Sequence, residues 1–476
     1  MKKGILFTII TVMLLGGCSS NSSPSLSISS TSNSSSVSSE TNYRENVKEV
    51  DKVVTDELKA CFDFFYETAN TDEDSPAYGL IPDRYNVARD YDPNGMASIA
   101  SVGFGLACLP IGVENEWITE EQGYERALKT IDKFLSNEQN FSGFFYHFMK
   151  YNDATRYDNK VEVSIIDTAI LICGALTAGK YFGGECEEKA YELYGNVDWS
   201  WYYDDSATHR FYMGFSPEKG FSGSWDQYGE QLMVYVLAAG SPVEENRVGK
   251  GAYNVMRNSS TLSGTDPDYD PFYLTYTGSI FTYQFSHAFI DFRNIVDAKD
   301  VNWFDNSVNA TKAAIKYAVQ NKNKFKTYSE NSWGFTACDG PNGYSGKYGS
   351  LPNTSRQTLL DGTVPPCGAI GSIAFTPEQS IAAMKHYKEN DKLWSKYGFI
   401  DAYNLGPTDD NVNNVDYSIV EKTKNGGWYA EDVIGIDKGV SALMIENYMS
   451  SMIWNIFMDI EYIQNGLENL GFTSRV

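Results

Sequence analysis

The sequence lacks the signatures of metal-dependent and nucleotide-dependent enzymes. It has four histidines in 476 residues and no His-x-x-x-His or Cys-x-x-Cys spacing, the arrangements that supply most zinc ligands. It also has no Gly-x-Ser-x-Gly elbow, no phosphate-binding Gly-Lys-Ser/Thr loop and no dinucleotide fingerprint. We therefore expect neither a metal nor a cofactor, and any chemistry should rest on ordinary side chains.

Basic residues are scarce as well. The chain has 38 Lys and Arg against 62 Asp and Glu, a formal net charge of -24. Such a surface repels phosphate backbones and anionic headgroups, so nucleic acid and polyanionic substrates are poor partners. Aromatic residues make up 14% of the chain. Their flat rings suit the faces of neutral sugars, although packing between helices explains most of them.

Beyond the first 20 residues, no apolar run is long enough to span a membrane. Residues 1–17 have two Lys and a short apolar run, which predict a signal peptide. The ending Leu15-Gly16-Gly17-Cys18 resembles a bacterial lipobox, so we expect cleavage before Cys18 and lipidation of its thiol. The alternative is an ordinary secretory signal with a chance cysteine. Residues 18–45 are a Ser-rich tether, which would hold a folded domain of residues 46–476 outside the cytoplasmic membrane.

Cysteine usage does not predict a disulfide framework. Cys61, Cys108 and Cys173 lie in apolar helical patterns and are expected in the core. Cys338 and Cys367 lie in loop-like sequence and could pair in an oxidising compartment, a question that spacing leaves open.

Helical periodicity recurs along the whole chain. Thr119 with Gln122 and Thr376 with Gln379 form capping-box patterns, each before an amphipathic run. We also expect helices at about 52–68, 97–110, 164–180, 185–196, 226–240, 279–291, 305–320, 439–457 and 459–470, with a short one near Leu393. Strands do not alternate with helices as a parallel sheet would require. One all-α domain is predicted, as a bundle, a solenoid or a ring of helical hairpins, and the many loops with acids and aromatics favour the ring.

Two acids precede the apolar part of GSWDQYGEQLMVYVLAAGSP. On a helix over 226–240, Asp226 and Glu230 would share the stripe that faces the core. A carboxylate facing inward is costly unless a cleft or a partner receives it. Glu230 lies near Trp225 and Tyr228, so burial should raise its pKa and suit it as a proton donor. For Asp226, a cap at the helix start is the stronger alternative.

Further acids and hydrogen-bonding groups line up elsewhere. Asp167 lies on a buried-looking stripe just after Glu162, although Ser164 and Asp167 also form a capping pattern. A polar row from Tyr283 to Arg293 is either a hydrogen-bonded seam in the core or a set of donors and acceptors for sugar hydroxyls. The expected substrate-binding residues are Glu162, Trp225, Asp226, Tyr283, Gln284, His287, Asp291, Arg293, Trp333, Asp339 and Trp428.

Seven segments together resemble a known family. They include SVGFGLACLPIGVENEW, VSIIDTAILICGALTAGKYF, WDQYGEQLMVYVLAAGSP, FTYQFSHAFIDFR, ENSWGFTACDGPNGY, GSIAFTPEQSIAAMKHY and GIDKGVSALMIENYMSSMIW. In this order they look like the bacterial glucoamylase-like family, which includes glycoside hydrolase family 144. The resemblance implies an (α/α)6 six-hairpin toroid that hydrolyses β-1,2-glucan or its oligosaccharides with inversion and without a cofactor.

The resemblance also implies site residues. The motif acids fall on Glu230, the implied general acid, and on Asp167 and Asp437, either of which could be the base. The sequence departs from the usual pattern at Gly229, Lys438, Val440 and the acidic segment 407–425. We expect a glycoside hydrolase that acts on a neutral glucan, with a monomer favoured. The alternatives are a glycan-binding lipoprotein without activity and a polysaccharide lyase on the same fold.

Overall fold

The computed structural model describes residues 42–44, 46–92, 95–206 and 208–475. The predicted signal peptide, the lipidated Cys18 and nearly all of the tether lie outside the described residues. From Tyr43 onward the described chain forms a single compact unit.

Helices alternate along the described chain between two kinds of burial. One kind buries a single stripe and faces solvent with the other side, as amphipathic sequences require. The other kind is buried on almost every side, as expected for helices at the centre of a domain. The half-buried helices are α1 (Lys52–Thr68), α3 (Glu120–Ser136), α5 (Gly184–Gly195), α7 (Lys250–Ser259), α9 (Trp303–Asn321) and α11 (Pro377–Lys388). The fully buried helices are α2 (Ile99–Glu114), α4 (Ile165–Phe182), α6 (Leu232–Gly240), α8 (Phe285–Phe289), α10 (Pro366–Ile370) and α13 (Gly435–Ser450).

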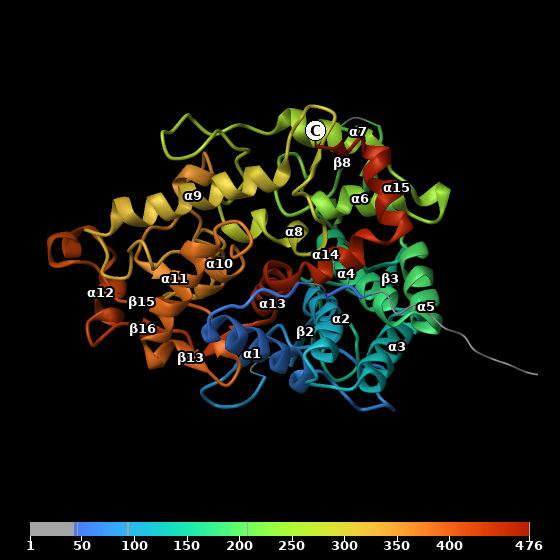
Figure 1. The fold of residues 1–476 in the computed structure, drawn as a ribbon, viewed down its shortest axis with the longest axis horizontal. Coiled ribbons are helices and arrows are strands. Elements are labelled where there is room, and N and C mark those ends of the chain that lie inside the picture. Colours follow the sequence, from blue (N-terminus) through green and yellow to red (C-terminus); the bar gives the residue numbers. More distant parts are fainter. Residues whose placement is uncertain (1–41, 45, 93–94, 207, 476) are drawn as a thin grey trace, which may run out of the picture. The chain divides into compact units, whose positions relative to one another are not determined.

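These two kinds of helix form concentric rings. Figure 1 shows the fully buried helices at the centre and the half-buried helices around them. Helix α13 packs against both α1 and α2, which closes the inner ring between the last and the first hairpins. The architecture is therefore the (α/α)6 toroid that the sequence predicts. Three further helices, α12 (Tyr417–Thr423), α14 (Met452–Met458) and α15 (Glu461–Leu470), are added to the rings.

Short antiparallel strands precede several inner helices. They are β2 (Met96–Ser98) before α2, β6 (Val163–Ser164) before α4, β12 (Thr363–Val364) before α10 and β17 (Asp432–Ile434) before α13. Two of these strands form pairs, β17 with β1 (Arg84–Asn86) and β2 with β5 (Phe148–Lys150). The other two belong to three-stranded sheets. Strand β6 pairs with β9 (Gly214–Ser216), which pairs with β10 (Gly220–Ser222), and β12 pairs with β15 (Tyr403–Asn404), which pairs with β16 (Trp428–Tyr429). Single bridges between Pro82 and Ala97 and between Tyr146 and Val163 link these pairs into a rim. The rim brings the N-terminal ends of α13, α2 and α4 together.

Most predicted helices are confirmed, with four informative differences. The segment predicted over 226–240 becomes helical only at Leu232, and the one over 279–291 is a 3₁₀ turn (Ile280–Tyr283) followed by the short α8. Helices α7, α10 and α12 carried no recognised signal. The Thr119 capping box is confirmed, whereas the Thr376 hydroxyl has no hydrogen-bond partner among the described residues.

The cysteines are thiols throughout the described part of the chain. Cys61, Cys108 and Cys173 are buried in the core, as predicted. Cys338 and Cys367 are buried and do not pair with each other.

Two glycines allow the closest helix contact in the ring. A Cβ at Gly174 on α4 would overlap the carbonyl oxygen of Gly103 on α2, and a Cβ at Gly103 would overlap the carbonyl oxygen of Ile170. The backbones of α2 and α4 thus touch where any side chain would push them apart.

We predict that Gly174→Ala lowers the free energy of unfolding by about 1–3 kcal/mol, because the added methyl group overpacks this contact. Urea denaturation followed by circular dichroism measures the change. Gly264→Ala is the matched control, since a Cβ there meets nothing within 4 Å. Equal stability of the two variants would contradict the prediction.

Candidate active site

A cleft of about 790 Å³ opens at the rim of the ring. Its walls come from β6, β9 and β10, from the loop that leads into α6, and from the start of α4. The lining residues that can exchange protons or carry charge are His147, Lys160, Glu162, Asp167, Glu218, Lys219 and Glu230, with Trp225 beside them. The cleft therefore unites three acids that the sequence singled out, Glu162, Asp167 and Glu230.

Glu230 lies in the turn that precedes α6 rather than on the helix. The predicted helical stripe through Asp226 and Glu230 is wrong, because the chain from 223 to 231 is irregular. Ser286 on α8 fixes this turn, donating to the carbonyl oxygen of Glu230 at 2.5 Å and accepting from the Met233 N–H at 3.0 Å. The position of Glu230 thus depends on an inner-helix contact.

Burial gives Glu230 an unusual pKa. Loss of hydration, followed by the negative charge of Asp167, raises the pKa of Glu230 to about 8, although the positive charge of His147 opposes the shift. At neutral pH this carboxyl group is therefore mainly protonated, as a proton donor must be.

His147, on the segment that leads into β5, holds two other acids of the cleft. Its Nδ1 lies 3.0 Å from Glu162 Oε1, and its Nε2 lies 3.4 Å from Asp167 Oδ1. Burial alone would lower the pKa of His147, but the charges of Asp167, Glu162 and Asp83 raise it to about 9. His147 is thus an imidazolium at neutral pH and bridges the two carboxylates.

The pKa values of the two bridged acids, Glu162 and Asp167, shift in opposite directions. Burial would raise the pKa of Glu162, but the hydrogen bond and charge of His147 bring it below its usual value. Burial raises the pKa of Asp167 despite His147 and the short Ser164 Oγ contact of 2.5 Å. Ser164 also caps α4, since its Oγ accepts from the Asp167 N–H at 3.3 Å. The cleft therefore holds Glu162, whose pKa is lowered, together with Asp167 and Glu230, whose pKa values are raised.

The cleft continues past Glu230. A second cavity of about 460 Å³ shares Met213, Gly223, Trp225 and Glu230 with the first. Asp226, Tyr228, Tyr276 and Phe281 are among its other lining residues. Glu230 thus lies where the two cavities meet, with space on either side for an extended substrate.

Asp437 belongs to another acid cluster at the same rim. It occupies the first turn of α13, as Asp167 occupies the first turn of α4. It lines a closed cavity of about 10 Å³ with Asp401, Cys367 and Lys438. Burial raises the pKa of Asp437 to about 6, against hydrogen bonds with Asp401 and Cys367.

Arg84 and Asp339 extend this cluster. The Arg84 Nη1 lies 3.1 Å from Asp339 Oδ2 and 3.2 Å from Asp432 Oδ2, and Asp401 Oδ2 accepts from the Asp339 N–H at 2.6 Å. The predicted residue Trp428 packs beside it, against Cys338, Tyr348 and Ala402. Substrate contact by Asp339 or Trp428 stays a prediction.

Several predicted substrate-binding residues are core residues instead. The Tyr283 hydroxyl donates to the carbonyl oxygen of Tyr273 at 3.0 Å, and Gln284 Nε2 donates to Gly368 O at 2.8 Å. His287 is buried beside Ser307, and loss of hydration lowers its pKa to about 3. The seam interpretation is correct here, because α8 is buried on all sides and its polar groups join neighbouring helices.

Other predictions fail for equally physical reasons. Asp291 and Arg293 follow the C-terminal end of α8, opposite the rim, where they form a two-point ion pair of 2.8 and 2.7 Å. Trp333 is fully buried in the core.

Reasoning from the sequence missed His147, Asp83 and Asp401. His147 is a lone histidine in the strand-like segment GFFYHF, and its partners lie 15 and 20 residues further on. Only the pairing of strands at the rim brings them together, so no local pattern could have identified the bridge.

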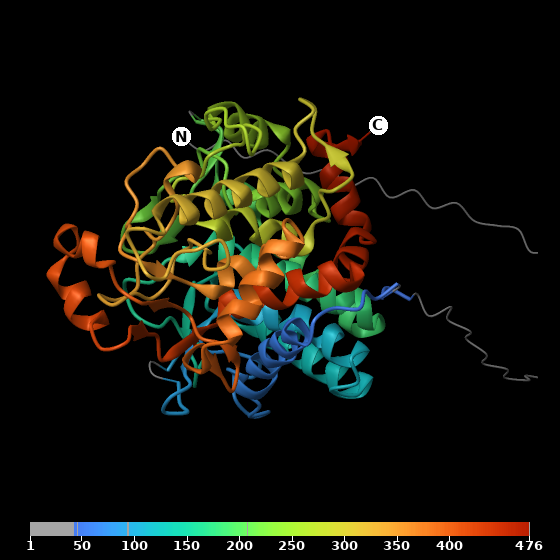
Figure 2. The ribbon, with the colours of Figure 1, turned by 60° about the vertical axis from the view of Figure 1, so that its left-hand side comes forward.

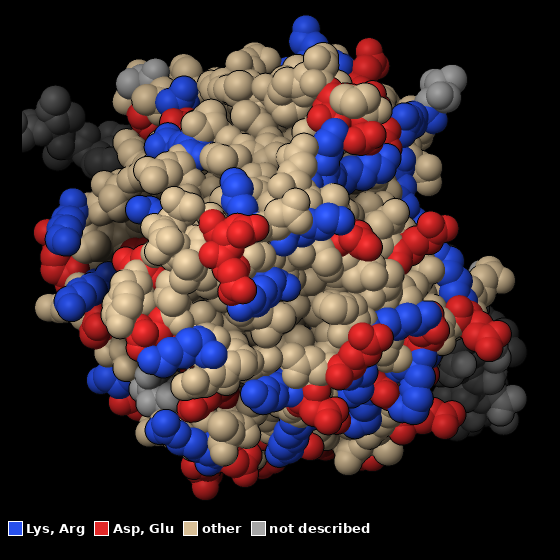
Figure 3. Space-filling model, turned by 90° about the vertical axis from the view of Figure 1, so that its left-hand side faces the viewer, with Lys and Arg blue, Asp and Glu red and all other residues tan. Residues whose placement is uncertain are grey.

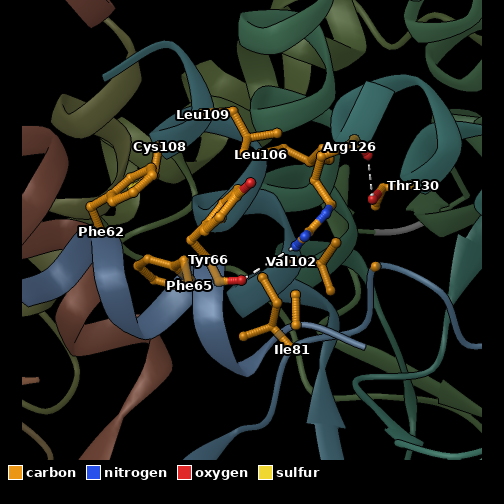
Figure 4. A pocket seen from close by; sticks show the side chains of 13 residues that line it. Phe62, Phe65, Tyr66, Ile81, Val102, Leu106, Cys108, Leu109, Arg126 and Thr130 are labelled. Carbon is orange, nitrogen blue, oxygen red and sulfur yellow. Dashed lines mark hydrogen bonds between the residues drawn. The ribbon is translucent and has the colours of Figure 1, made fainter. Parts of the chain in front are cut away.

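A further cavity between α1, α2 and α3 is not a site. Figure 4 shows Phe62, Phe65, Leu106 and other apolar side chains around it, with Arg126 along one side. The volume is about 20 Å³, and no carboxylate lines it. No cluster of His, Cys, Asp and Glu among the described residues could hold a metal ion.

The chain resembles curated and solved proteins over most of its length. It is 27% identical to the exo β-1,2-glucooligosaccharide sophorohydrolase (non-reducing end) of Parabacteroides distasonis, over 90% of this chain but only 60% of that protein. The chain thus spans less than two thirds of the curated relative.

Solved structures share the fold. The endo-β-1,2-glucanase of Chitinophaga pinensis, in complex with sophorotriose and glucose, matches with a TM-score of 0.73 and 25% identity, over 90% of this chain and 99% of that one. A β-1,2-glucanase of Parabacteroides distasonis matches with a TM-score of 0.73 and 24% identity, over 88% of this chain and 59% of that one.

The model of one protein family, described as "Putative glucoamylase", matches residues 222–461, half of the chain. The match includes Glu230, the turn before α6, and Asp437 on α13. The chain therefore belongs to this glucoamylase-like family.

Proposed function

We propose that this chain is a glycoside hydrolase that cleaves β-1,2-glucan or its oligosaccharides with inversion, with Glu230 as the general acid. The observation that carries the proposal is a half-buried Glu230 that lines one cleft together with Glu162 and Asp167, the two carboxyl groups bridged by His147. Hydrolysis of a glycosidic bond needs such a pair, one carboxylic acid to protonate the leaving oxygen and one carboxylate to activate water.

The surroundings of the cleft support a neutral substrate. Its lining includes the acidic residues Glu162, Asp167 and Glu218 and the basic residues Lys160 and Lys219, so it does not carry charge of a single sign. On the face shown in Figure 3, acidic and basic residues are interspersed among uncharged ones. A lyase that holds uronates needs a cationic site instead. The β-1,2 linkage rests on the printed activities of the relatives.

For the base, the geometry favours Asp167 over Asp437. Asp167 lines the same cleft as Glu230, and its charge acts directly on Glu230. Asp437 lies in the small closed cavity beside Asp401. In this proposal Asp167 activates the water, His147 orients its carboxylate, and Asp437 supports the rim next to it.

We also propose that Cys18 is lipidated and that the tether holds the domain on the outer side of a bacterial membrane. The lipobox-like sequence and the Ser-rich residues after it support this location.

Glu230→Gln should reduce kcat on β-1,2-glucooligosaccharides by roughly 10²- to 10⁴-fold, because the amide cannot donate the proton. Oligosaccharide binding, measured by calorimetry, should persist. Product chromatography of the wild-type reaction measures the release of oligosaccharides. Proton NMR of the same reaction should show the α anomer of the product first, as inversion of a β-linkage requires.

The matched control is Glu245→Gln, an exposed acid on the turn Glu244–Asn246, which should behave as the wild type. Full activity in Glu230→Gln would remove Glu230 from the mechanism. A wild-type protein that binds oligosaccharides without cleaving them would favour the glycan-binding alternative.

The pH profile should depend on His147. Activity needs a protonated Glu230, so kcat/KM should fall as the pH rises through about 8. The charge of His147 lowers the pKa of Glu230, Asp167 and Glu162. Its removal in His147→Gln should therefore move both limbs of the profile to higher pH, as measured by kcat/KM between pH 4 and 10.

His386→Gln, a substitution of an exposed histidine on α11, should leave both limbs in place. A His147→Gln profile with unchanged limbs would show that the bridge has no electrostatic effect on catalysis.

Cys18→Ser should release the protein from the membrane fraction, because no thioether to the lipid can form. Fractionation of cells that express the full chain, followed by immunoblotting, measures the distribution. Retention of Cys18→Ser in the membrane fraction would contradict the lipid anchor.

A further inference from the structure

The loop between α9 and α10 forms a tight hairpin of residues 338–345. Cys338 and Ser345 exchange backbone hydrogen bonds of 3.4 and 2.9 Å, and Gly340 and Gly343 exchange bonds of 3.1 and 2.9 Å across the tip. Gly343 has a φ of 102°, a conformation that favours glycine. We call residues 338–345 the Tyr344 hairpin, because Tyr344 follows this turn directly.

Tyr344 is half exposed and lies near Arg84 of the rim. Its side chain is among the exposed large hydrophobic groups, at 51% exposure. Beside it, Asp339 of the same hairpin pairs with Arg84 of β1 at 3.1 Å, and Arg84 also lies 3.2 Å from Asp432. The Arg84 guanidinium lies 6.0 Å from the ring centre. The ring thus lies beside the Arg84–Asp339 ion pair and still presents apolar surface to solvent.

The Tyr344 hairpin lies on the same rim as the cleft. Arg84, in β1 of the rim, lies 3.1 Å from Asp339 of the hairpin, and the N–H of the neighbouring Asp83 donates to Met96 O in β2 at 2.9 Å. The backbone agrees, since Gly435 at the start of α13 donates to Asp83 O at 2.8 Å. Strand β2 in turn pairs with β5, which follows His147, so the strands of the rim connect the Tyr344 hairpin to the cleft.

Helix α12 braces the Tyr344 hairpin from outside the ring. Lys422 Nζ donates to Pro341 O at 2.6 Å and to Asn342 Oδ1 at 2.9 Å, while Asn342 Nδ2 donates to Ser418 Oγ at 2.8 Å. Helix α12 belongs to the acidic segment 407–425 that departs from the family pattern. Figures 1 and 2 show it projecting from the body of the ring.

We propose that Tyr344 is a sugar-binding platform on the rim that carries the cleft, and that α12 positions it to set the length of glucan the site accepts. A half-exposed aromatic ring, fixed by a glycine turn below and a helix outside, loses little conformational entropy when the apolar face of a pyranose stacks on it. This inference rests on the proposed function, since the ligand is a glucosyl unit of the same β-glucan.

Chain-length dependence tests the platform. Tyr344→Ala should lower kcat/KM on long β-1,2-glucooligosaccharides by about tenfold, mainly through KM, because one stacking contact is lost. The shortest cleaved oligosaccharide, which does not reach the platform, should be affected by less than about twofold. Tyr344→Phe keeps the ring and should retain the wild-type length dependence.

Two further variants separate the platform from folding. Lys422→Met removes the brace without removing the ring, so it should show a smaller loss with the same length dependence. Tyr417→Ala removes an exposed tyrosine from α12 but leaves Ser418 and Lys422 in place, and it should match the wild type. Thermal unfolding of each variant identifies any that fails to fold.

The outcomes are distinct. Equal losses of Tyr344→Ala on short and long substrates, or no loss on either, would overturn the platform while the hydrolase proposal stands. An inactive wild type, or a fully active Glu230→Gln, would overturn the proposed function itself.

Discussion

The chemistry of this ring depends on where its inner helices begin. Helices α4 and α13 each start after a strand of the rim and carry an aspartate in the first turn, Asp167 and Asp437. Backbone N–H groups at a helix N-terminus are unpaired and carry partial positive charge, so they favour a carboxylate there even when it is buried. Glu230 lies before α6 and outside that first turn, so burial and the charge of Asp167 dominate its pKa. The inner helices thus place Asp167 and Asp437 at helix starts and Glu230 outside one.

The positive charge of His147 offsets the repulsion between the acids of the cleft. Several acids in one cleft would repel one another, and some would take up protons. A single imidazolium between Glu162 and Asp167 compensates two of them, and its own pKa rises to about 9 in return. The strand segments around His147 and Glu162 fix this contact, because the His147 N–H donates to the Glu162 carbonyl oxygen at 3.0 Å. The rim therefore sets the electrostatics of the cleft.

Periodicity predicted the rings well but the cleft only partly. The outer helices other than α7 have apolar stripes that predicted them, and α2 and α4 were recognisable as long apolar runs. Helix α10 has five residues and ends before any period is visible. Two arguments pointed to Glu230. The family motif is present, but the predicted helical stripe is wrong, because α6 begins two residues after Glu230. The polar row from Tyr283 to Arg293 was wrongly predicted to bind substrate. Hydrogen-bonding side chains that join buried helices have the same sequence spacing as those that face a ligand, so the sequence does not distinguish them.

The same ion pair closes the ring of helices and lies next to the second acid cluster. Lys438 departs from the family pattern, and its Nζ lies 2.8 Å from Glu57 Oε1 on α1, with both side chains buried. A buried charge without a partner is strongly destabilising, so Lys438 and Glu57 must be present together. Arg44 forms a second such link, 2.8 Å from Glu446 on the same helix α13. The residue next to Lys438 is Asp437, whose pKa the Lys438 charge helps to lower against burial. The contact that joins the last inner helix to the first outer helix therefore also affects the pKa of Asp437 in the second acid cluster.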